Sequence, residues 1–375
     1  MRLFKKLNPL LIALLFAMIG GQATVYAQSN IKEGNNFFAM YTKDGDFKNL
    51  EQARKFADNA YKERRDSSSY DNNLLRALVY SSLSVADSNR KLKYSKDPIE
   101  EAELALSKLT DKQLNFENAP QLTYINRKLA NANLILATRA IKGNKTEDAL
   151  NYFKEVDRLS EGDIKVKYNL SVLSSKLGRH GDAVNYYKQY LETSGPIKVA
   201  DVLLLSDLYA KAGNNNEQLN TLLNGRDYFP EDKNILFKII NIYAANGSYD
   251  AIVPLVDEAY RLEPESIELN YLAGYAYEVT GNQKLAEQYF KNVINLDDNN
   301  YNANYELGLL YLRDFVKNTS NVQSLELAEK YLLKANEIDP NSVNALKSLA
   351  ILFGKSGDTL QYERVRNQLN QNIFN

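Results

Sequence analysis

Parts of this chain superimpose on one another at a fixed offset of 34 residues, and this period constrains the fold more than any other feature. The clearest segments are 203–209, 237–243, 271–277 and 305–311. A repeat of this length is typical of a stack of small supersecondary units, each of which buries its apolar face on its neighbours. A stack of this kind needs no single large core, so the 375 residues do not have to divide into globular domains.

Each unit is predicted to be two amphipathic helices joined by a short turn. A mostly small residue recurs inside the first helix, at Ala137, Ser171, Ser206, Ile240, Gly274, Gly308 and Ala350. A second series marks the second helix, at Ala149, Ala183, Gln218, Ile252, Ala286, Ala328 and Tyr362. Glycines are expected to end the first helices, at Gly178, Gly213, Gly247, Gly281 and Gly357. Prolines follow the second helices, at Pro230, Pro264 and Pro340.

The two series also locate two irregularities in the period. One extra residue falls near Gly195-Pro196, and eight extra residues fall around Asp314 to Ser324. The repeat stays in phase on both sides of the longer insertion, so we expect it to lengthen one unit without breaking the stack. Tyrosines three residues after the small position of the first helix are expected to pack on the next helix, at Tyr209, Tyr243, Tyr277 and Tyr311.

The repeated residues resemble the tetratricopeptide repeat (TPR) family. The clearest copy has Leu307, Gly308, Tyr311, Ala328, Leu332, Ala335 and Pro340, and the next has Gly274, Tyr277, Ala286 and Phe290. The resemblance covers about residues 130–369 as seven units, although the tryptophan of the family motif is absent throughout. It implies an all-α, right-handed superhelical solenoid of antiparallel helix hairpins, about nine in number.

Three parts of the chain are distinguished by their sequence. Residues 1–27 are predicted to be a signal peptide, and residues 28–129 to form divergent N-terminal helical hairpins and a cap. Within that part, Asp44 to Phe47 is expected to be a repeat turn and Ile99 to Leu109 a second helix. Residues 130–375 are predicted to form the array of about seven repeats, with the last repeat as the C-terminal cap.

The first 27 residues have the pattern of a secretory signal peptide. Arg2, Lys5 and Lys6 precede a short apolar run, and Val25 and Ala27 stand where a signal peptidase recognises small residues. The alternative is an uncleaved membrane anchor, but the apolar run is shorter than the roughly 20 residues that a span needs. We therefore expect cleavage after Ala27 and no transmembrane segment in the mature chain.

The absence of cysteine excludes disulfides and a lipid-modified cysteine, so the protein is not expected to be a lipoprotein. The charged start, Ala27-Gln28 and a mature chain rich in Asn, Lys and Tyr resemble envelope proteins of Gram-negative bacteria. The periplasm is therefore the expected location.

Charge and residue types argue against several functions. A net charge of −1 gives no basic surface for nucleic acid. His180, the only histidine, is expected in a solvent-facing turn, and without cysteine it offers no convincing nucleophilic or metal site. Asp44 and Asp46 lack the further oxygen ligands of a calcium loop and are attributed to a repeat turn. We predict no catalytic residue, metal or cofactor.

The candidate binding residues lie on the first helices, which line the concave groove in TPR proteins. The groove-facing residues are predicted to be Tyr168, Phe237, Asn241, Tyr271, Tyr275 and Tyr305. Tyrosine gives large, rigid and amphipathic contact area, which suits peptide recognition. The alternative is that tyrosine, with 26 copies in the chain, simply fills space. Lysines expected for a carboxylate clamp are replaced by these aromatic residues.

The predicted function is a non-catalytic scaffold of the bacterial cell envelope that binds a peptide or protein partner in the groove. Envelope assembly, secretion and surface-polymer export are the processes considered. A periplasmic glycan-binding protein is the alternative, because stacked tyrosines and asparagines also suit sugars. An enzyme with an unrecognised carboxylate site is the third hypothesis.

Overall fold

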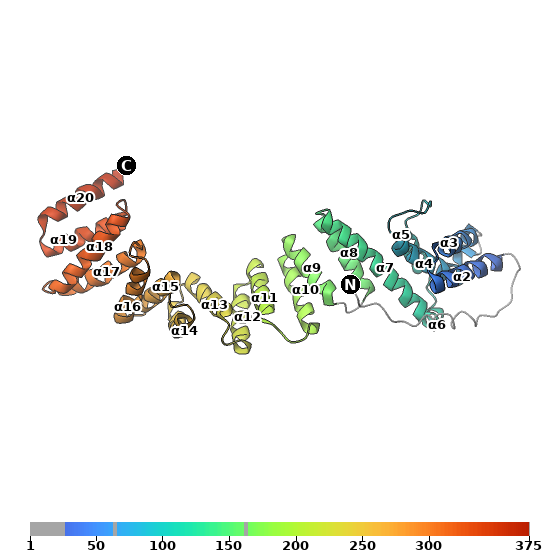
Figure 1. Ribbon diagram of the computed structural model, residues 1–375, viewed down its shortest axis with the longest axis horizontal. Helices are drawn as coiled ribbons and strands as arrows, with labels where there is room; N and C mark the ends of the chain where they lie inside the picture. Colours follow the sequence, from blue (N-terminus) through green and yellow to red (C-terminus); the bar gives the residue numbers. More distant parts are fainter. Residues whose placement is uncertain (1–26, 63–65, 161–163, 375) are drawn as a thin grey trace. The chain divides into compact units, whose positions relative to one another are not determined.

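A computed structural model describes residues 27–62, 66–160 and 164–374 (Figure 1). The regular structure of these residues consists of nineteen α-helices and one 3-10 helix, with no strand. Consecutive helices pair into nine hairpins, the fifth of which is closed where Val202 lies against Gly225, and one further short helix, α6 (Lys112–Glu117), precedes the third hairpin. The predicted all-α fold of antiparallel hairpins is confirmed. The predicted signal peptide lies outside the described residues, apart from Ala27 at the start of the first described helix.

The described chain divides into two compact units. The N-terminal unit extends to residue 197 and includes residues 208–213, and the C-terminal unit contains residues 198–207 and everything from 214 onwards. The boundary predicted between residues 129 and 130 falls inside a helix and stays a prediction. The helices of the N-terminal unit are α2 (Ala27–Asp44), α3 (Phe47–Lys62), η2 (Asp66–Ser68), α4 (Tyr70–Ala86), α5 (Pro98–Ser107), α6 (Lys112–Glu117), α7 (Ala119–Lys142), α8 (Thr146–Leu159), α9 (Ile164–Lys176) and α10 (His180–Thr193).

Helix α11 (Val199–Lys211) contributes residues to both units. The remaining helices of the C-terminal unit are α12 (Asn215–Tyr228), α13 (Lys233–Ala245), α14 (Tyr249–Leu262), α15 (Ile267–Val279), α16 (Gln283–Leu296), α17 (Tyr301–Lys317), α18 (Val322–Ile338), α19 (Val343–Ser356) and α20 (Thr359–Phe374).

In the N-terminal unit, small residues let the helices approach closely. Ala53, Ala57 and Ala60 recur along α3 and are completely buried, as the predicted second helix requires. The long helix α7 packs on both α4 and α8, so it joins two neighbouring hairpins. The core of this unit also contains a charged side chain, Arg76, which is 1% exposed.

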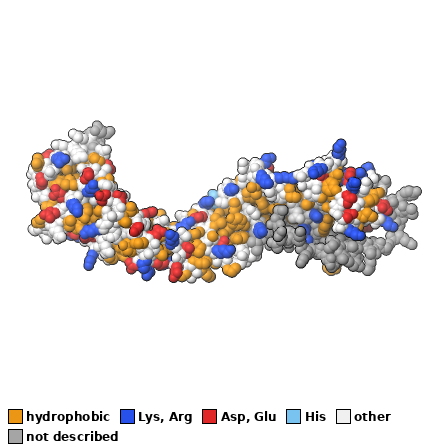
Figure 2. All heavy atoms as spheres, viewed as in Figure 1, with side chains coloured by type: hydrophobic (Ala, Val, Ile, Leu, Met, Phe, Trp, Pro, Cys, Tyr) orange, Lys and Arg blue, Asp and Glu red, His pale blue; other side chains and the backbone are white. Residues whose placement is uncertain are grey.

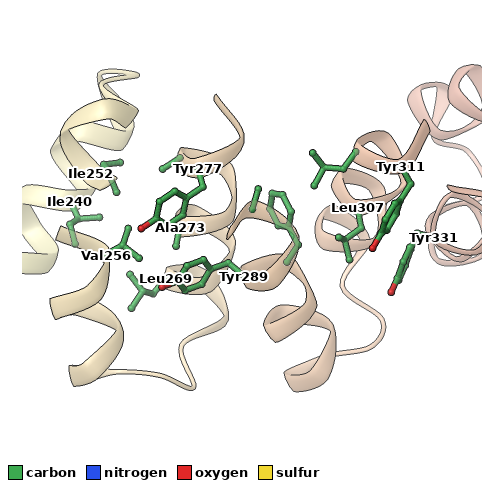
Figure 3. Close-up of a cluster of buried hydrophobic side chains, with 14 of the residues drawn as sticks. Ile240, Ile252, Val256, Leu269, Ala273, Tyr277, Tyr289, Leu307, Tyr311 and Tyr331 are labelled. Carbon is green, nitrogen blue, oxygen red and sulfur yellow. The ribbon is translucent and has the colours of Figure 1, made fainter. Parts of the chain in front are cut away.

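In the C-terminal unit, one hydrophobic core runs from hairpin to hairpin (Figure 3). Tyr311 of α17 lies parallel to Tyr331 of α18, with ring centroids 5.9 Å apart and an interplanar angle of 8°. Tyr277 of α15 stacks in the same way on Tyr289 of α16, at 5.7 Å and 10°. All four rings are buried, so the predicted packing of Tyr277 and Tyr311 is confirmed. Tyr209 and Tyr243, at the equivalent positions, are only partly buried.

The turns explain why the period survives in repeats whose sequences diverge. The five predicted glycines end first helices with φ between 71° and 87°, in the left-handed region that favours glycine. Asn144 stands 34 residues before Gly178 and has a φ of 55°, a conformation that asparagine tolerates better than most residues. The next first helices begin at recurring side-chain caps, at Asp232, Ser266, Asn300 and Ser342.

The longer insertion extends one hairpin at its tip. Helix α17 has 17 residues where α15 has 13, and α18 has 17 residues where α16 has 14. The turn between α17 and α18 is one residue longer than the turn between α15 and α16, which accounts for the last of the eight inserted residues. Helix α18 still packs on α19, so the insertion does not break the stack, as predicted.

The position of His180 differs from the prediction. It is the first residue of α10 rather than a solvent-facing turn residue, and it is partly buried. Its Nδ1 atom is buried without a hydrogen-bond partner in the described structure. Only the N-cap residue Arg179 separates the left-handed Gly178 from the start of the helix, so the turn is shorter than the sequence suggests.

The substitution Gly308→Leu is expected to lower the free energy of unfolding of the C-terminal unit by about 1–3 kcal/mol, the usual cost of overpacking. A Cβ atom at Gly308 would lie 2.6 Å from Leu332 Cγ and 3.1 Å from the Leu332 backbone nitrogen, so α17 and α18 would have to separate. Gly354→Ala is the matched control, because its Cβ would meet the Tyr362 ring at an ordinary 3.6 Å. Segment-resolved hydrogen exchange measures the stability of both variants. Unchanged protection of α17 and α18 in Gly308→Leu would contradict the expectation.

Candidate functional site

The first helices of the C-terminal unit have two faces that differ in burial. On α15 and α17 the residues three after the small position lie in the core: Tyr277 and Tyr311 are only 7% and 8% exposed. Residues three before it, Phe237, Tyr271 and Tyr305, are partly exposed, although each packs against the edge of the core. We call the face formed by these three residues, Asn241 and Tyr275 the first-helix face.

Tyr271 and Tyr275 form the best-defined part of the first-helix face. They lie one turn apart on α15, and their rings stack with centroids 6.4 Å apart. Tyr249, the first residue of α14, meets Tyr275 edge to face at 4.9 Å. Phe290 of α16 supports Tyr271 from the core side at 5.7 Å. The structure thus brings two predicted residues together with a tyrosine that sequence reasoning missed.

Tyr305 lies on the next first helix, α17, in a second aromatic pair. Its ring stacks on Tyr301 at 5.8 Å with an interplanar angle of 9°. The Tyr305 hydroxyl lies 3.4 Å from Ser348 Oγ, and the Tyr301 hydroxyl lies 2.5 Å from Ser342 Oγ. Both tyrosines are therefore held between α17 and α19, which gives the face a defined shape.

Phe237 and Asn241 lie one turn apart on α13. Phe237 packs against the hydrophobic core, whereas Asn241 is exposed. Lys238, beside Phe237, forms an ion pair with Asp207 of α11. The polar groups at this end of the face therefore already have partners or are solvated.

Tyr168 belongs to α9 in the N-terminal unit. It is 40% exposed and packs on its own hairpin, with its ring 5.5 Å from Tyr190 and 6.3 Å from Tyr187 of α10. The neighbouring Asn169 amide donates to the Lys165 carbonyl oxygen, 2.7 Å away, so this amide is engaged within its own helix. Tyr168 is thus a separate candidate, in the other unit from the remaining predicted residues.

Sequence reasoning missed the charged groups that border the first-helix face. Glu278 follows Tyr275 by three residues on α15, and its Oε1 accepts a hydrogen bond from Arg313 of α17 at 2.7 Å. Burial, and then the charge of Glu278, raises the pKa of Glu306 to about 7, while Arg313 opposes this shift. A helical-wheel search for charged residues beside the aromatic positions could have found Glu278 and Glu306, whereas their mutual proximity depends on how α15 and α17 pack.

The N-terminal unit contains a separate hollow of about 810 Å³ among α5, α7 and α8. Its wall includes Leu106, Leu129 and Asn133, and charged residues such as Glu103 and Arg158 line it as well. Burial raises the pKa of Glu103, and Arg158 opposes this effect. No feature of the repeat pattern predicts this hollow.

Charges of both signs are mixed on one face of the described residues. On the face seen in Figure 2, lysine and arginine side chains are interspersed with aspartate and glutamate. No group of three or more His, Asp or Glu side chains in the described residues could hold a metal ion. Among the helices described, none combines the length and apolar character needed to cross a membrane.

The chain is similar to tetratricopeptide repeat proteins. A family model of the tetratricopeptide repeat matches residues 164–195 and 267–300, which correspond to the α9–α10 and α15–α16 hairpins. These two stretches are therefore tetratricopeptide repeats, as predicted. No curated protein sequence matches the chain.

Solved structures of TPR proteins also resemble the fold. The C-terminal part of a TPR repeat-containing protein from Cytophaga hutchinsonii is 15% identical, with a TM-score of 0.49, over 62% of this chain and 92% of that one. A MamA structure from MSR-1 is 21% identical, with a TM-score of 0.37, over 47% and 97%. YrrB, described as a TPR protein with an unusual peptide-binding site, is 17% identical, with a TM-score of 0.37, over 46% and 89%.

Proposed function

We propose that this protein is a non-catalytic scaffold that binds a peptide or protein partner on the first-helix face of its C-terminal unit. The observation that carries the proposal is the recurrence of partly exposed aromatic residues at Phe237, Tyr271 and Tyr305, at intervals of 34 residues. An extended partner could contact all three, because equivalent side chains of successive repeats lie on equivalent faces of successive helices.

Physical chemistry supports a binding role for these residues. Partly exposed tyrosines that are already stacked lose little conformational freedom on binding and contribute large apolar area. The pairs Tyr271–Tyr275 and Tyr301–Tyr305 are preorganised in this way. Aromatic anchors of this kind commonly dominate the binding energy of an interface.

The double variant Tyr271→Ala, Tyr305→Ala tests the proposal. It is expected to remain folded, with the free energy of unfolding reduced by about 2 kcal/mol or less, because both side chains are already partly exposed. It is also expected to lose the partner that the unaltered protein captures from an envelope fraction. Tyr228→Ala is the control, because Tyr228 is 71% exposed and lies on a second helix, α12.

Peptide and glycan arrays distinguish the proposed class of ligand. Binding to peptides that the double variant loses would support the scaffold. Binding to glycans alone would favour the alternative function, and unchanged capture by a folded double variant would refute a role for the first-helix face.

We propose further that the protein acts in the periplasm, with a role in envelope assembly or secretion. The proposal rests on the signal-peptide pattern of residues 1–27 and on the absence of cysteine. Cleavage after Ala27 would make Gln28 the first residue of the mature protein, and N-terminal sequencing of the exported protein measures this. Recovery of the intact chain with Met1 from a membrane fraction would contradict it.

A further inference from the structure

Three tyrosines and a glutamate gather along one edge of α15. Tyr271, Tyr275 and Glu278 are spaced by four and three residues, so they lie on one face of the helix. The Tyr271 and Tyr275 rings stack, and Tyr249 closes the group edge to face against Tyr275. Stacked and tilted rings of this kind present electron-rich faces, which attract cations.

Of the two carboxylates beside these rings, Glu278 has one cationic partner, Arg313, and Glu306 has none among the described residues. The Glu278 side chain is 10% exposed, and while its Oε1 accepts from Arg313, its Oε2 is buried without a hydrogen-bond partner in the described structure. Glu306 of α17 makes no hydrogen bond or ion pair with any described residue. Glu306 is therefore not paired with a cation among the described residues, and a buried carboxylate oxygen without a partner, such as Glu278 Oε2, is costly.

We infer that Tyr271, Tyr275, Glu278 and Glu306 form a site for the cationic head of a lysine or arginine side chain presented by the partner. The inference rests on the proposed function and names the chemistry that the first-helix face recognises. The cation would lie against the tyrosine rings and donate hydrogen bonds to Glu278 Oε2 and to Glu306. The same cation would give Glu278 Oε2 a hydrogen-bond partner and neutralise the charge of the Glu306 carboxylate.

The composition of the site favours an organic cation over a metal ion. Calcium takes six to eight oxygen ligands and magnesium takes six. One side of this site consists of aromatic ring faces, which supply no such oxygen ligands. Ring faces bind ammonium and guanidinium groups, which are large and weakly hydrated compared with metal ions. The residue that already reaches the site from within the chain, Arg313, has the same chemistry as the proposed ligand.

Binding is expected to depend on pH through Glu306. Because the pKa of Glu306 is raised to about 7 in the free protein, this carboxyl is largely protonated at about pH 6 and largely ionised at about pH 8. The cation needs the ionised form, so binding should strengthen as the pH rises. The other titratable or charged groups around the site are Glu278, Arg313, Tyr249, Tyr271 and Tyr275.

The test uses the full chain labelled with carbon-13 in its tyrosine rings, observed by NMR. The probes are N-acetyl-lysine methylamide and N-acetyl-norleucine methylamide, a neutral counterpart that lacks the terminal amino group. Variants Tyr271→Phe and Tyr275→Phe assign the two signals. The lysine probe is expected to shift the signals of Tyr271 and Tyr275, and the neutral probe is expected to leave them unchanged.

Charge variants distinguish a built site from general attraction to an acidic surface. Glu306→Gln is expected to weaken lysine-probe binding by about tenfold, the effect of losing one charge-assisted hydrogen bond. Glu268→Gln, which removes an exposed carboxylate from α15, the helix of Tyr271 and Tyr275, should leave binding unchanged. Arg313→Met removes the competing guanidinium and should tighten binding, which a merely damaged fold would not do.

The outcomes separate this inference from the proposed function. Equal shifts with both probes, equal weakening by Glu306→Gln and Glu268→Gln, or weaker binding in Arg313→Met would overturn the cation site. If the cation site fails while the Tyr271→Ala, Tyr305→Ala variant still loses its captured partner, the scaffold proposal stands without it. If the double variant keeps its partner, the proposed function itself falls.

Discussion

Replacing Arg76 with methionine is expected to lower the free energy of unfolding of the N-terminal unit by about 3–5 kcal/mol, the usual cost of removing one partner from a buried ion pair. Arg76 is 1% exposed and connects α4 to both neighbouring helices. Its Nη1 donates to Asp58 Oδ1 of α3 at 2.8 Å, and its Nη2 donates to Glu101 of α5. Methionine would leave Asp58 with Arg54 and Lys96, and Glu101 with Lys96 alone.

The neighbouring groups do not reproduce both contacts of Arg76. Arg54 pairs with Asp58 Oδ2 at 3.0 Å, but the one other cation beside Glu101 among the described residues is Lys96. Lys96 lies 3.4 Å from both carboxylates but is 38% exposed, so its charge is screened by solvent. The Tyr80 hydroxyl donates a hydrogen bond to Asp58 Oδ1 at 2.8 Å, but a neutral hydroxyl does not balance the negative charge of the ionised carboxylate. The loss should therefore appear as reduced hydrogen-exchange protection of α3, α4 and α5.

The pH dependence gives this prediction a second measurement. Burial alone would raise the pKa of Asp58, but the hydrogen bond from Tyr80 and the charges of Lys96 and Arg76 hold it below its usual value. A carboxyl group whose pKa is lower in the folded than in the unfolded state stabilises the fold when the pH is above its unfolded-state pKa. This stabilisation is lost as the pH falls through the folded-state pKa. The deficit of Arg76→Met should therefore shrink in acid, where Asp58 is protonated in both proteins.

Arg158→Met is the matched control for Arg76→Met. Arg158 also contacts two carboxylates, at 2.7 Å to Glu155 and 3.5 Å to Glu103, but its side chain is 59% exposed. Its loss should cost about 1 kcal/mol or less, as exposed ion pairs usually do. Equal costs for the two substitutions would show that the burial of Arg76 has no energetic consequence.

Tyr277→Ala is expected to lower the free energy of unfolding of the C-terminal unit by about 3–5 kcal/mol, because it removes a buried aromatic ring and leaves a cavity. Tyr277 is 7% exposed and stacks on Tyr289, which in turn meets Tyr260 edge to face at 5.6 Å. Tyr277→Phe keeps the ring and should be nearly neutral. Urea unfolding followed by circular dichroism, with segment-resolved hydrogen exchange, measures the difference.

Tyr275→Ala is the control on the same helix. Tyr275 lies two positions before Tyr277 but belongs to the first-helix face, where it is only partly buried. Its loss should cost about 1–2 kcal/mol, within the range of ordinary single substitutions. A larger cost for Tyr275→Ala than for Tyr277→Ala would show that the assignment of the two faces is wrong.

The local structure of the repeats could be predicted because it depends on residues close together in the sequence. Each glycine that adopts a left-handed conformation ends its helix whatever lies beyond it, and each capping Ser, Asn or Asp begins the next one. The hairpins and the position of the insertion followed from these signals. The division of the insertion between α17, α18 and their turn could not be predicted in this way, because the length of a helix at a free tip is set by packing rather than by the repeat period.

The identity of the aromatic positions came from the sequence, but their surroundings came from the tertiary structure. The period placed Tyr271 and Tyr305 on equivalent faces of α15 and α17. The cluster of Tyr249, Glu278 and Glu306 around them depends on the spacing between hairpins, which no local pattern encodes. The His180 prediction failed for a related reason, since the exposure of a turn residue depends on the helix that packs over it.

The sequence by itself determined the class of fold, the glycines that end five of the first helices and the face on which a partner is expected, because period and turn glycines act over a few residues. Only the tertiary structure decided which charged groups meet, as in Arg76 with Asp58 and Glu101, and where the chain divides into two compact units. These features join residues from different helices, and their energies arise from burial and low local dielectric, which exist only once the hairpins are stacked.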